Sequence, residues 1–364
     1  MVPGGISPEN LDAAVLVVGA GPAGLAIASC LKRDGIDFVL VDRDGEIGGA
    51  YRRIAAETQL LSPARYTELP GLAIANRGEY VSAGQYHDYL RRYAEWNDLQ
   101  VVKASVDQIN PTADGLEVFF SNNGIGQTKR YPAVVLATGI FDHPVRPAIL
   151  GLGIGADGPR VIHSSDWQNV VPGVLGRILI IGAGMSGVEI AEQCAAAGVK
   201  ATISSKKRIR LWRRSLFGVD IHHFVHLFAH RIPLWMTGSY CQKLPALRAF
   251  DRGFREGVRA GWIIQRGEVC RFEGKQAVFQ NGTQEDFDMV VVATGYRWAP
   301  ACLPEQAETG DLGQPMTSDG RVHGVPGLFV IGAPCGRMLP SEFLRGVALD
   351  APEIAKLIAK RLMD

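Results

Sequence analysis

The chain has 364 residues, of which 47% are hydrophobic and 21% charged, and its formal net charge is +1. This length suits two domains that each bury a core, and the composition excludes the fibrous and disordered classes. A nearly neutral chain has no overall attraction for nucleic acid or for an anionic membrane, so we expect small molecules as partners.

The six cysteines lie far apart and show no CxxC or other metal-ligand spacing. They predict free thiols in a reducing compartment and argue against zinc and against a redox-active pair. No segment resembles a secretory signal, and Gly19, Gly21 and Gly24 interrupt the uncharged stretch 13–31. We therefore expect a cytoplasmic protein without an integral membrane segment, and an oligomer stays open. The cysteines are Cys30, Cys194, Cys241, Cys270, Cys302 and Cys335.

The first predicted unit is a strand, a glycine turn and a helix. The β-rich run 15–18 leads into a GxGxxG turn at 19–24, and an apolar helical run follows from Leu25. In such a turn one glycine permits the tight bend, one lets the backbone approach a pyrophosphate, and one lets the helix pack on the strand. The free N–H groups of the helix then bind the phosphates. A single copy is also compatible with an ordinary glycine turn in an α/β domain.

The next strand, 38–41, ends in Asp42, at the distance from the turn where an acid accepts hydrogen bonds from an adenosine ribose. Gly48 and Gly49 follow, and paired glycines suit a second close approach of the backbone to a ligand longer than a mononucleotide. These features place FAD in the N-terminal half. The run 134–136 continues into the turn Ala137-Thr138-Gly139.

The same pattern occurs a second time along the chain. The strand 178–181 precedes the second GxGxxG at 182–187, and the strand 290–292 ends in a second Ala-Thr-Gly turn at 293–295. Two copies in matching contexts predict an α/β fold with two Rossmann-like dinucleotide-binding domains.

The second copy lacks the acid that the first copy has in Asp42. Ser205 occupies the equivalent place, and Lys206, Lys207 and Arg208 follow it. Hydroxyl and cationic groups bind a 2′-phosphate, which a carboxylate would repel, so we expect NADPH in this half. The alternative is a solvated basic turn.

The middle segment 216–247 carries His222, His226 and His230 at four-residue spacing. Without an acid or a cysteine in register, we interpret them as a helix face with solvent-reaching imidazoles, and we expect no metal. The nearby Arg210, Arg213 and Arg214 are compatible with nucleic-acid binding, but a rim for cofactor phosphates explains them more simply.

The two glycine turns, the turn Gly48-Gly49-Ala50-Tyr51, and Ala-Thr-Gly followed by Pro144 and Pro147 together resemble class B flavin monooxygenases. This group includes the flavin-containing monooxygenases, the plant YUCCA family and the Baeyer–Villiger enzymes. The likeness extends to the C-terminal end, where 327–332 and 345–351 look like a return to the FAD domain.

The resemblance implies a discontinuous arrangement: residues 1–160 as the first part of the FAD domain, 161–295 as an inserted NADP domain, and 296–364 as the return segment of the FAD domain. It also implies that the segment 216–247 covers the substrate side, with a helical excursion away from substrate as the alternative. The residues expected to contact FAD are Gly19, Gly21, Pro22, Ala23, Gly24, Asp42, Arg43, Gly48, Gly49, Ala50, Tyr51, Val106, Ala137, Thr138, Gly139 and Gly332. The residues expected to contact NADP are Gly182, Gly184, Met185, Ser186, Gly187, Ser205, Lys206, Lys207, Arg208, Ala293, Thr294, Gly295 and Tyr296.

By resemblance, the activity is oxygenation of an N, S or carbonyl centre of a small substrate with O₂ through a flavin C4a-hydroperoxide. The chain departs from the family pattern in two places. His163 and Trp167 match the end of the FxGxxxHxxxW fingerprint, but Asp157 and Pro159 replace its Phe and Gly. The segment 58–63 lacks the Asn of the flavin-containing monooxygenases, so Thr58 and Gln59 are the pocket candidates, with His163 as a hinge, a cofactor contact or a structural residue.

Two other functions are compatible with the same motifs. An NADPH-dependent flavoprotein reductase would share the fold and both cofactor sites without inserting oxygen. A non-catalytic NADPH-binding regulator would use the domain pair as a sensor.

Overall fold

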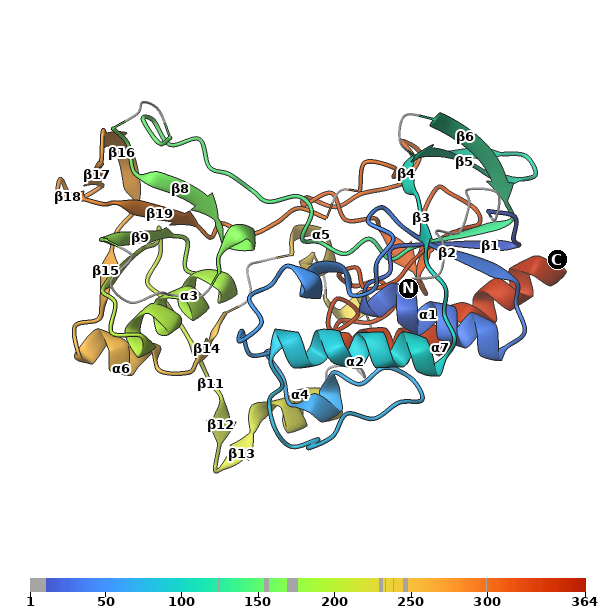
Figure 1. Cartoon of the computed structure of the whole chain (residues 1–364), viewed down its shortest axis with the longest axis horizontal. Helices are drawn as coiled ribbons and strands as arrows, with labels where there is room; N and C mark the ends of the chain where they lie inside the picture. The colour runs from blue at the N-terminus through green and yellow to red at the C-terminus, as the bar shows by residue number, and fades with distance from the viewer. Residues whose placement is uncertain are drawn as a thin grey trace, which may run out of the picture. The chain divides into compact units, whose positions relative to one another are not determined.

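The computed structural model describes residues 11–364, apart from 123–124, 154–156, 169–175, 229–231, 233, 238, 245–247 and 299. They form two compact units that alternate along the chain (Figure 1). Unit 1 contains the chain up to Asp142, then Phe224–Leu244 and Arg297–Asp364, and unit 2 contains His143–His223 and Pro245–Tyr296. Each unit has its own core and its own sheet, which is all parallel in unit 2 and parallel apart from the edge strands β20 and β21 in unit 1.

The sheet of unit 1 has the strand order β20-β21-β22-β7-β1-β2-β3. Its central strand β1 (Val15–Val18) pairs in parallel on both sides, so Val15 lies opposite both Phe38 and Ala133. All of β1 is buried, because other elements cover both faces of the sheet. The other strands are β2 (Phe38–Asp42), β3 (Val102–Lys103), β7 (Ala133–Leu136), β20 (Thr317–Ser318), β21 (Arg321–Val322) and β22 (Leu328–Val330).

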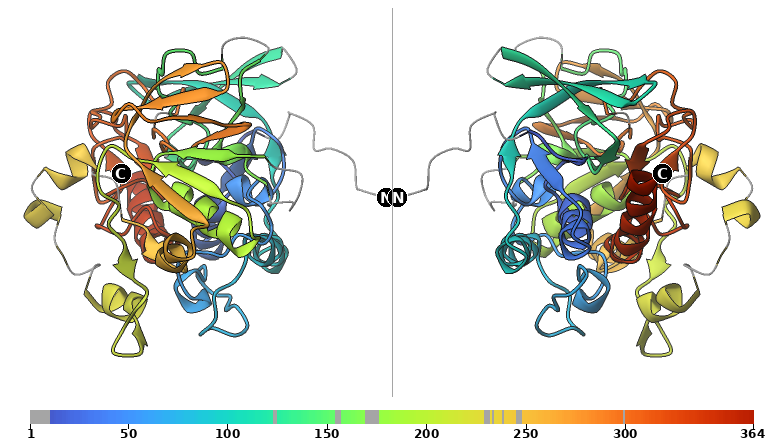
Figure 2. Two further views of the ribbon diagram at one scale, coloured as in Figure 1. Left: turned by 90° about the vertical axis from the view of Figure 1, so that its left-hand side faces the viewer. Right: turned by 90° about the vertical axis from the view of Figure 1, so that its right-hand side faces the viewer.

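Helices cover one face of this sheet. The blue α1 (Pro22–Arg33) lies between the cyan α2 (Ala83–Trp96) and the red α7 (Leu344–Met363), as Figure 2 shows. Apolar side chains of all three helices form one buried cluster with Val15 and Val17. Two short 3-10 helices, η1 (Gly49–Arg52) and η2 (Ala64–Tyr66), lie in the connection between β2 and α2.

The opposite face is covered by an antiparallel sheet. Val118 and Phe120 from this sheet pack in one buried cluster with Leu16 and Leu136, whose side chains point away from the helices. The strands of the covering sheet are β4 (Ser105–Thr112), β5 (Gly115–Asn122) and β6 (Ile125–Tyr131).

Unit 2 repeats this plan. Its parallel sheet has the order β15-β10-β9-β19-β8, with helices packed on one face and a three-stranded antiparallel sheet on the other. Its parallel strands are β8 (Arg160–His163), β9 (Ile178–Ile181), β10 (Ala201–Ser204), β15 (Ile263–Arg266) and β19 (Met289–Val292). The covering elements are α3 (Met185–Ala196), α6 (Phe254–Arg259), β16 (Val269–Glu273), β17 (Gln276–Phe279) and β18 (Gln284–Asp286), and η3 (Ser164–Asp166) follows β8.

The two units therefore share the same arrangement of strands and helices, as the repeated motifs predicted. In each unit the strand before the glycine turn is central, the strand that follows the first helix pairs on one side, and the strand before Ala-Thr-Gly pairs on the other. The β1-α1-β2 segment corresponds to β9-α3-β10. The prediction of two Rossmann-like domains is confirmed.

The segment between β10 and β15 contains short elements. They are β11 (Trp212–Arg213), β12 (Ser215–Leu216), β13 (Val219–Asp220), α4 (Ile221–Phe228), η5 (Leu234–Thr237), α5 (Tyr240–Lys243) and β14 (Phe250–Asp251). Leu227 and Phe228 in α4 are exposed. The described part of 216–247 contains a short antiparallel strand pair and short helices, and it leaves both interpretations of the segment open.

The prediction that all cysteines are unpaired is wrong at two positions. Cys241 in α5 and Cys335 after β22 form a disulfide across 94 residues of sequence. Sequence spacing does not reveal this pair, because the fold of unit 1 is what brings two distant segments together. Cys30, Cys194, Cys270 and Cys302 are free, and Cys270 alone of these four is exposed.

The stretch 13–31 is divided between β1, the glycine turn and α1, as expected. In the part of the chain that the structure describes, no helix combines the length and the apolar character needed to cross a membrane.

Candidate functional site

The first glycine turn in unit 1 is fixed by contacts that admit no side chain. A Cβ on Gly19, whose φ is +107°, would lie 2.6 Å from the carbonyl oxygen of Ala137. A Cβ on Gly24 would lie 1.8 Å from the carbonyl oxygen of Gly19, so the start of α1 packs directly on the end of β1. No described side chain caps the α1 N-terminus at Gly21, which leaves its N–H groups available to an anion.

The paired glycines after β2 complete a cradle of bare backbone. Gly48 donates its N–H to the carbonyl oxygen of Ala20 at 2.9 Å, which holds the second turn against the first. Gly49 has a φ of +55°, and a Cβ there would lie 3.0 Å from the Cα of Gly21. Gly49 therefore packs directly against Gly21, and no side chain lies between the two turns. The residues present fit the close approach of a dinucleotide.

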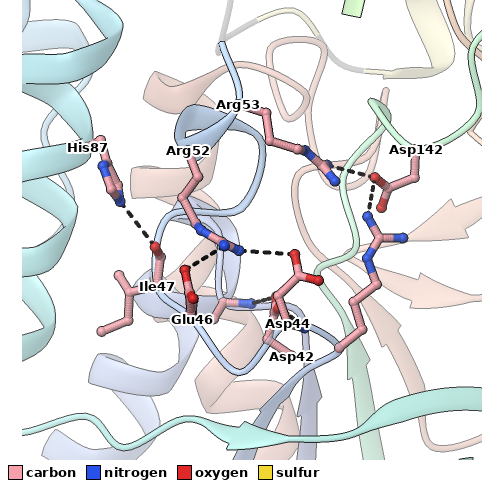
Figure 3. Close-up of polar contacts among 10 residues, drawn as sticks. Asp42, Asp44, Glu46, Ile47, Arg52, Arg53, His87 and Asp142 are labelled. Carbon is pink, nitrogen blue, oxygen red and sulfur yellow. Dashed lines mark hydrogen bonds and ion pairs between the residues drawn. The ribbon is translucent and has the colours of Figure 1, made fainter. Parts of the chain in front are cut away.

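Asp42 ends β2 beside the same turn. Its Oδ2 accepts the N–H of Ala20 at 3.0 Å, and its Oδ1 accepts the N–H of Asp44 at 2.9 Å (Figure 3). These bonds orient the carboxylate, and its remaining lone pairs can accept ribose hydroxyls. This geometry fits the predicted role.

The charged residues around Asp42 are paired with one another. Arg52 binds Asp44 at 3.0 Å and also contacts Glu46, and Arg53 binds Asp142 at 2.8 Å (Figure 3). Arg43, an expected FAD contact, donates to the same Asp142 at 2.7 Å. An arginine already paired in this way has less capacity for a cofactor phosphate.

Other expected FAD contacts surround the turn. The Oγ1 of Thr138 is buried without a hydrogen-bond partner among the described residues, which suits a cofactor that supplies one. A Cβ on Gly332 would lie 3.1 Å from the Cβ of Ala23, so the C-terminal return segment reaches the first turn of α1. Tyr51 packs edge-on against Tyr86, with ring centroids 4.7 Å apart.

Three candidates lie apart from this glycine cradle. Val106 lies in β4, opposite Phe120. Gln59 is exposed and forms an isolated antiparallel bridge with Ser82. Thr58 is half-buried, and its carbonyl oxygen accepts the N–H of Ala83.

Unit 2 has the same cradle around its second glycine turn. A Cβ on Gly187 would lie 2.0 Å from the carbonyl oxygen of Gly182, as for the corresponding glycines of unit 1. No described side chain caps the α3 N-terminus at Gly184. Met185 and Ser186 form the first turn of α3.

This turn opens into a hollow of about 1330 Å³. The expected residues that line it are Gly182, Gly184, Ser205, Lys206, Lys207, Arg208 and Thr294. The expected residues outside the lining are Met185, Ser186, Gly187, Ala293, Gly295 and Tyr296. All three cationic candidates and the glycine backbone therefore border one hollow, as binding of a 2′-phosphorylated nucleotide requires.

The hollow is also lined by residues that the sequence motifs did not predict. Arg248, Glu268 and Cys270 also line the hollow, and Glu268 lies 3.0 Å from the Nζ of Lys206. They belong to segments outside the motifs, with Cys270 inside β16, so only tertiary packing brings them to the second turn. Arg210, predicted as part of a phosphate rim, lines the hollow as well.

His163 is fully buried at the end of β8. Its Nδ1 accepts the N–H of Ser165 at 3.1 Å, and its ring packs edge-on against Tyr296. Burial lowers the pKa of His163, and the charge of Arg146 lowers it further. Its Nε2 is buried without a hydrogen-bond partner among the described residues, so these contacts leave the hinge, the cofactor contact and the structural residue open as interpretations.

Trp167, the last residue of the FxGxxxHxxxW fingerprint, contributes to the packing of unit 2. Trp167 is buried, and its Nε1 donates to Oε1 of Gln193 in α3 at 2.8 Å. This bond attaches the segment after η3 to the helix that begins at the second glycine turn.

The histidines of the middle segment do not form one exposed face. His222 is buried, and its Nδ1 lies 2.9 Å from Oδ1 of Asp220, so the interpretation as a solvent-reaching imidazole is wrong for this residue. His226 packs against Tyr66, with ring centroids 4.9 Å apart. His230 lies outside the described residues.

The amino-acid sequence of this chain is similar to known proteins. The model of the family described as pyridine nucleotide-disulphide oxidoreductase matches residues 16–216, more than half of the chain. A probable indole-3-pyruvate monooxygenase of Arabidopsis thaliana is 26% identical over 384 residues, which cover 94% of this chain and 87% of the relative.

Solved structures share the fold. A flavin-containing monooxygenase from Stenotrophomonas maltophilia superposes with a TM-score of 0.78 at 22% identity, covering 96% of this chain and 99% of the other. A bacillithiol disulfide reductase from Bacillus cereus superposes with a TM-score of 0.71 at 19% identity, with the same coverage. Proteins of this fold therefore include both an oxygenase and a reductase.

Proposed function

Because this chain belongs to the pyridine nucleotide-disulphide oxidoreductase family, we propose that it is an NADPH-dependent FAD monooxygenase that oxygenates an N, S or carbonyl centre of a small organic substrate with O₂. A flavin-dependent oxidoreductase is the class to which its relatives belong, and FAD and NADPH are their cofactors. The observation that carries the proposal is the asymmetry of the duplicated cradles. One cradle ends in the carboxylate of Asp42, and the other in the cations Lys206, Lys207 and Arg208.

The domain assignment follows from this asymmetry. We assign residues 1–160 and 296–364 to an FAD domain and residues 161–295 to an inserted NADP domain. The approach of Gly332 to Ala23 supports the return of the chain to the FAD cradle.

The protein residues bind and orient the cofactors. The α1 N-terminus would hold the FAD pyrophosphate, Asp42 the adenosine ribose, and the Oγ1 of Thr138 a further polar atom of FAD. The α3 N-terminus and the cluster from Ser205 to Arg208 would hold NADPH. Bound FAD supplies the redox chemistry and the reaction with O₂, and the protein controls which molecules reach it.

A flavoprotein reductase is the second candidate. The bacillithiol disulfide reductase shares the fold, and this chain contains a disulfide within the unit that carries the FAD cradle. A non-catalytic regulator is a third candidate, and bound FAD that NADPH reduces would exclude it.

Rapid mixing of the NADPH-reduced protein with O₂ distinguishes the first two candidates. A monooxygenase gives a transient absorbance spectrum that belongs neither to reduced nor to oxidised flavin, and the transient decays faster with substrate. A reductase gives oxidised flavin and hydrogen peroxide in one phase. The second result would overturn the proposal, and incorporation of ¹⁸O from O₂ into product would support it independently.

A further inference from the structure

The disulfide between Cys241 and Cys335 stands among free thiols. The chain has four further cysteines, all of them unpaired, and Cys270 among them is exposed. Domains that depend on disulfides for stability carry them densely, whereas a single pair beside free thiols is typical of proteins in which the pair responds to redox conditions. The cysteine usage of this chain therefore favours a redox-responsive role for the Cys241–Cys335 pair.

The backbone at Cys335 has a conformation that a cysteine seldom adopts. Its φ is +52°, in the left-handed region that favours glycine. Residues in such conformations persist where the surrounding structure fixes them, and they cluster at functional sites. The carbonyl oxygen of Gly336 is fixed here by the Oγ1 of Thr317 at 2.6 Å and by the N–H of Gly320 at 2.9 Å. Cys335 is therefore held in place by its neighbours, within bonding distance of Cys241.

The segment that carries Cys241 is held more loosely. No described residue of 224–244 belongs to the two buried apolar clusters of unit 1, and Phe228 and Met236 are exposed. The ring of His226 packs on Tyr66, at the other end of the segment from Cys241. Segments with few buried apolar contacts open at low free energy. The attachments of α5 therefore decide whether the end of this segment stays in place.

Hydrogen bonds and the disulfide both attach α5 to the rest of unit 1. The Nε2 of the buried Gln314 donates to the carbonyl oxygens of Cys241 and Gln242 at 2.8 and 3.0 Å. The N–H of Asp311 donates to the same oxygen of Gln242 at 3.0 Å. These bonds use backbone carbonyls, so they can form whether or not Cys241 is joined to Cys335. Opening of the disulfide therefore weakens the attachment of α5 without removing a part of the core.

The fixed partner of the pair lies in a loop that borders the first glycine turn. Cys335 follows Gly332 closely in the chain, and a Cβ on Gly332 would lie 3.1 Å from the Cβ of Ala23 in the first turn of α1. The disulfide therefore joins the loosely held segment to the same loop that reaches the cradle of unit 1.

We propose that Cys241 and Cys335 form a thiol–disulfide exchange site, at which a dithiol reductant releases the segment 234–244 from the loop that carries Cys335. Cys241 is half-buried and Cys335 is buried, so an attacking thiolate reaches the sulfur of Cys241. It forms a mixed disulfide with Cys241, while Cys335 leaves as a thiolate and takes up a proton. The second thiol of the reductant then displaces Cys241, which is protonated in turn. The reductant becomes a disulfide, and its two electrons reside on the two cysteines.

This site lies outside the proposed oxygenation reaction. Its electrons come from an external dithiol, whereas those of the oxygenation come from NADPH through the flavin. The exchange therefore takes place in the oxidised holoprotein, without NADPH and without a substrate.

The test equilibrates the FAD-loaded protein with mixtures of reduced and oxidised dithiothreitol. Maleimide labelling and mass measurement count the thiols, which should rise from four to six in one step while the absorbance of bound flavin persists. Hydrogen exchange of the amides in 234–244 should become about 10-fold faster or more in the reduced protein, because local opening then costs less free energy. The sheet of β4, β5 and β6 in the same unit should exchange as before. Reoxidation should restore the slow exchange.

Three variants separate release of the segment from general loss of structure. Cys335→Gly removes the disulfide and suits the left-handed backbone, so it should fold and show the fast exchange without any reductant. Gln314→Ala removes the hydrogen bonds to α5 and should accelerate exchange of 234–244 much more in the reduced than in the oxidised protein. Cys270→Ser removes an exposed thiol outside the pair and is the matched control, which should respond to dithiothreitol as the unmodified chain does.

Three results would overturn the inference. The disulfide opens only as flavin is lost, which makes it a purely structural bond; or it opens while exchange of 234–244 stays slow; or NADPH alone opens it in the holoprotein. The last result would place the pair in the electron path of the flavin. The rapid-mixing experiment can fail while the response to dithiothreitol stands, so the two proposals are tested separately.

Discussion

Replacement of Lys206 by alanine tests the assignment of NADPH to unit 2. The Nζ of Lys206 lies 3.0 Å from Oε1 of Glu268, and the two side chains are 78% and 39% exposed. Both residues border the hollow that opens from the second glycine turn. In the free protein Lys206 is therefore held by an acid that the 2′-phosphate has to displace or share.

The expected magnitude is a difference between two contributions. A hydrogen bond from a cation to phosphate contributes about 1.5–3 kcal/mol. Release of Lys206 from an exposed ion pair costs about 0.2–1 kcal/mol. The net contribution of about 0.5–2.8 kcal/mol corresponds to a loss of about 2-fold to 100-fold in NADPH affinity for Lys206→Ala. NADH lacks the 2′-phosphate, so its affinity should change by less than about 2-fold.

Titration of the oxidised holoenzyme with NADPH and with NADH measures both affinities. Glu268→Gln releases Lys206 and removes a repelling carboxylate, so NADPH should bind up to about 5-fold more tightly. Lys200→Ala, an exposed lysine of unit 2 outside the hollow, is the control. Equal losses for NADPH and NADH in Lys206→Ala would refute the assignment, and so would an unchanged NADPH affinity.

Three further outcomes are expected. Gly24→Ala should abolish FAD retention, because its Cβ would lie 1.8 Å from a carbonyl oxygen of the same turn, whereas Gly126→Ala, with open space around it, should keep normal flavin content in absorbance measurements. Burial raises the pKa of Glu342 from 4.5 to about 7, so the folded state gains stability from this proton at low pH and loses it as the pH rises through 7. Glu342→Gln should accordingly raise the free energy of unfolding in urea at pH 8 and leave it nearly unchanged at pH 4. Thiol titration of the unreduced, unfolded protein should count four free cysteines, and six thiols before reduction would contradict the disulfide. Reduction of Cys241–Cys335 should lower the free energy of unfolding by about 4.7 kcal/mol, the value that loop-closure entropy gives for a long loop.

The local features of the fold could be predicted because they depend on neighbouring residues. The strand, glycine turn and helix at 15–33 and 178–196 appear where the motifs place them, since a bare backbone turn between an apolar run and a helix permits little else. The difference between Asp42 and Ser205 is likewise local, because each residue follows its strand at a fixed distance from the turn. The likeness to flavin monooxygenases was also evident from these motifs, and the relatives confirm it.

The sequence alone therefore determined that this chain folds as two dinucleotide-binding domains, because periodicity and glycine spacing act over a few residues. Tertiary structure alone decided that Cys241 meets Cys335 and that Glu268 faces Lys206. Each of these outcomes depends on segments far apart in the sequence. Their distances and their shielding from water are set by how the sheets and helices pack, and no local pattern encodes that packing.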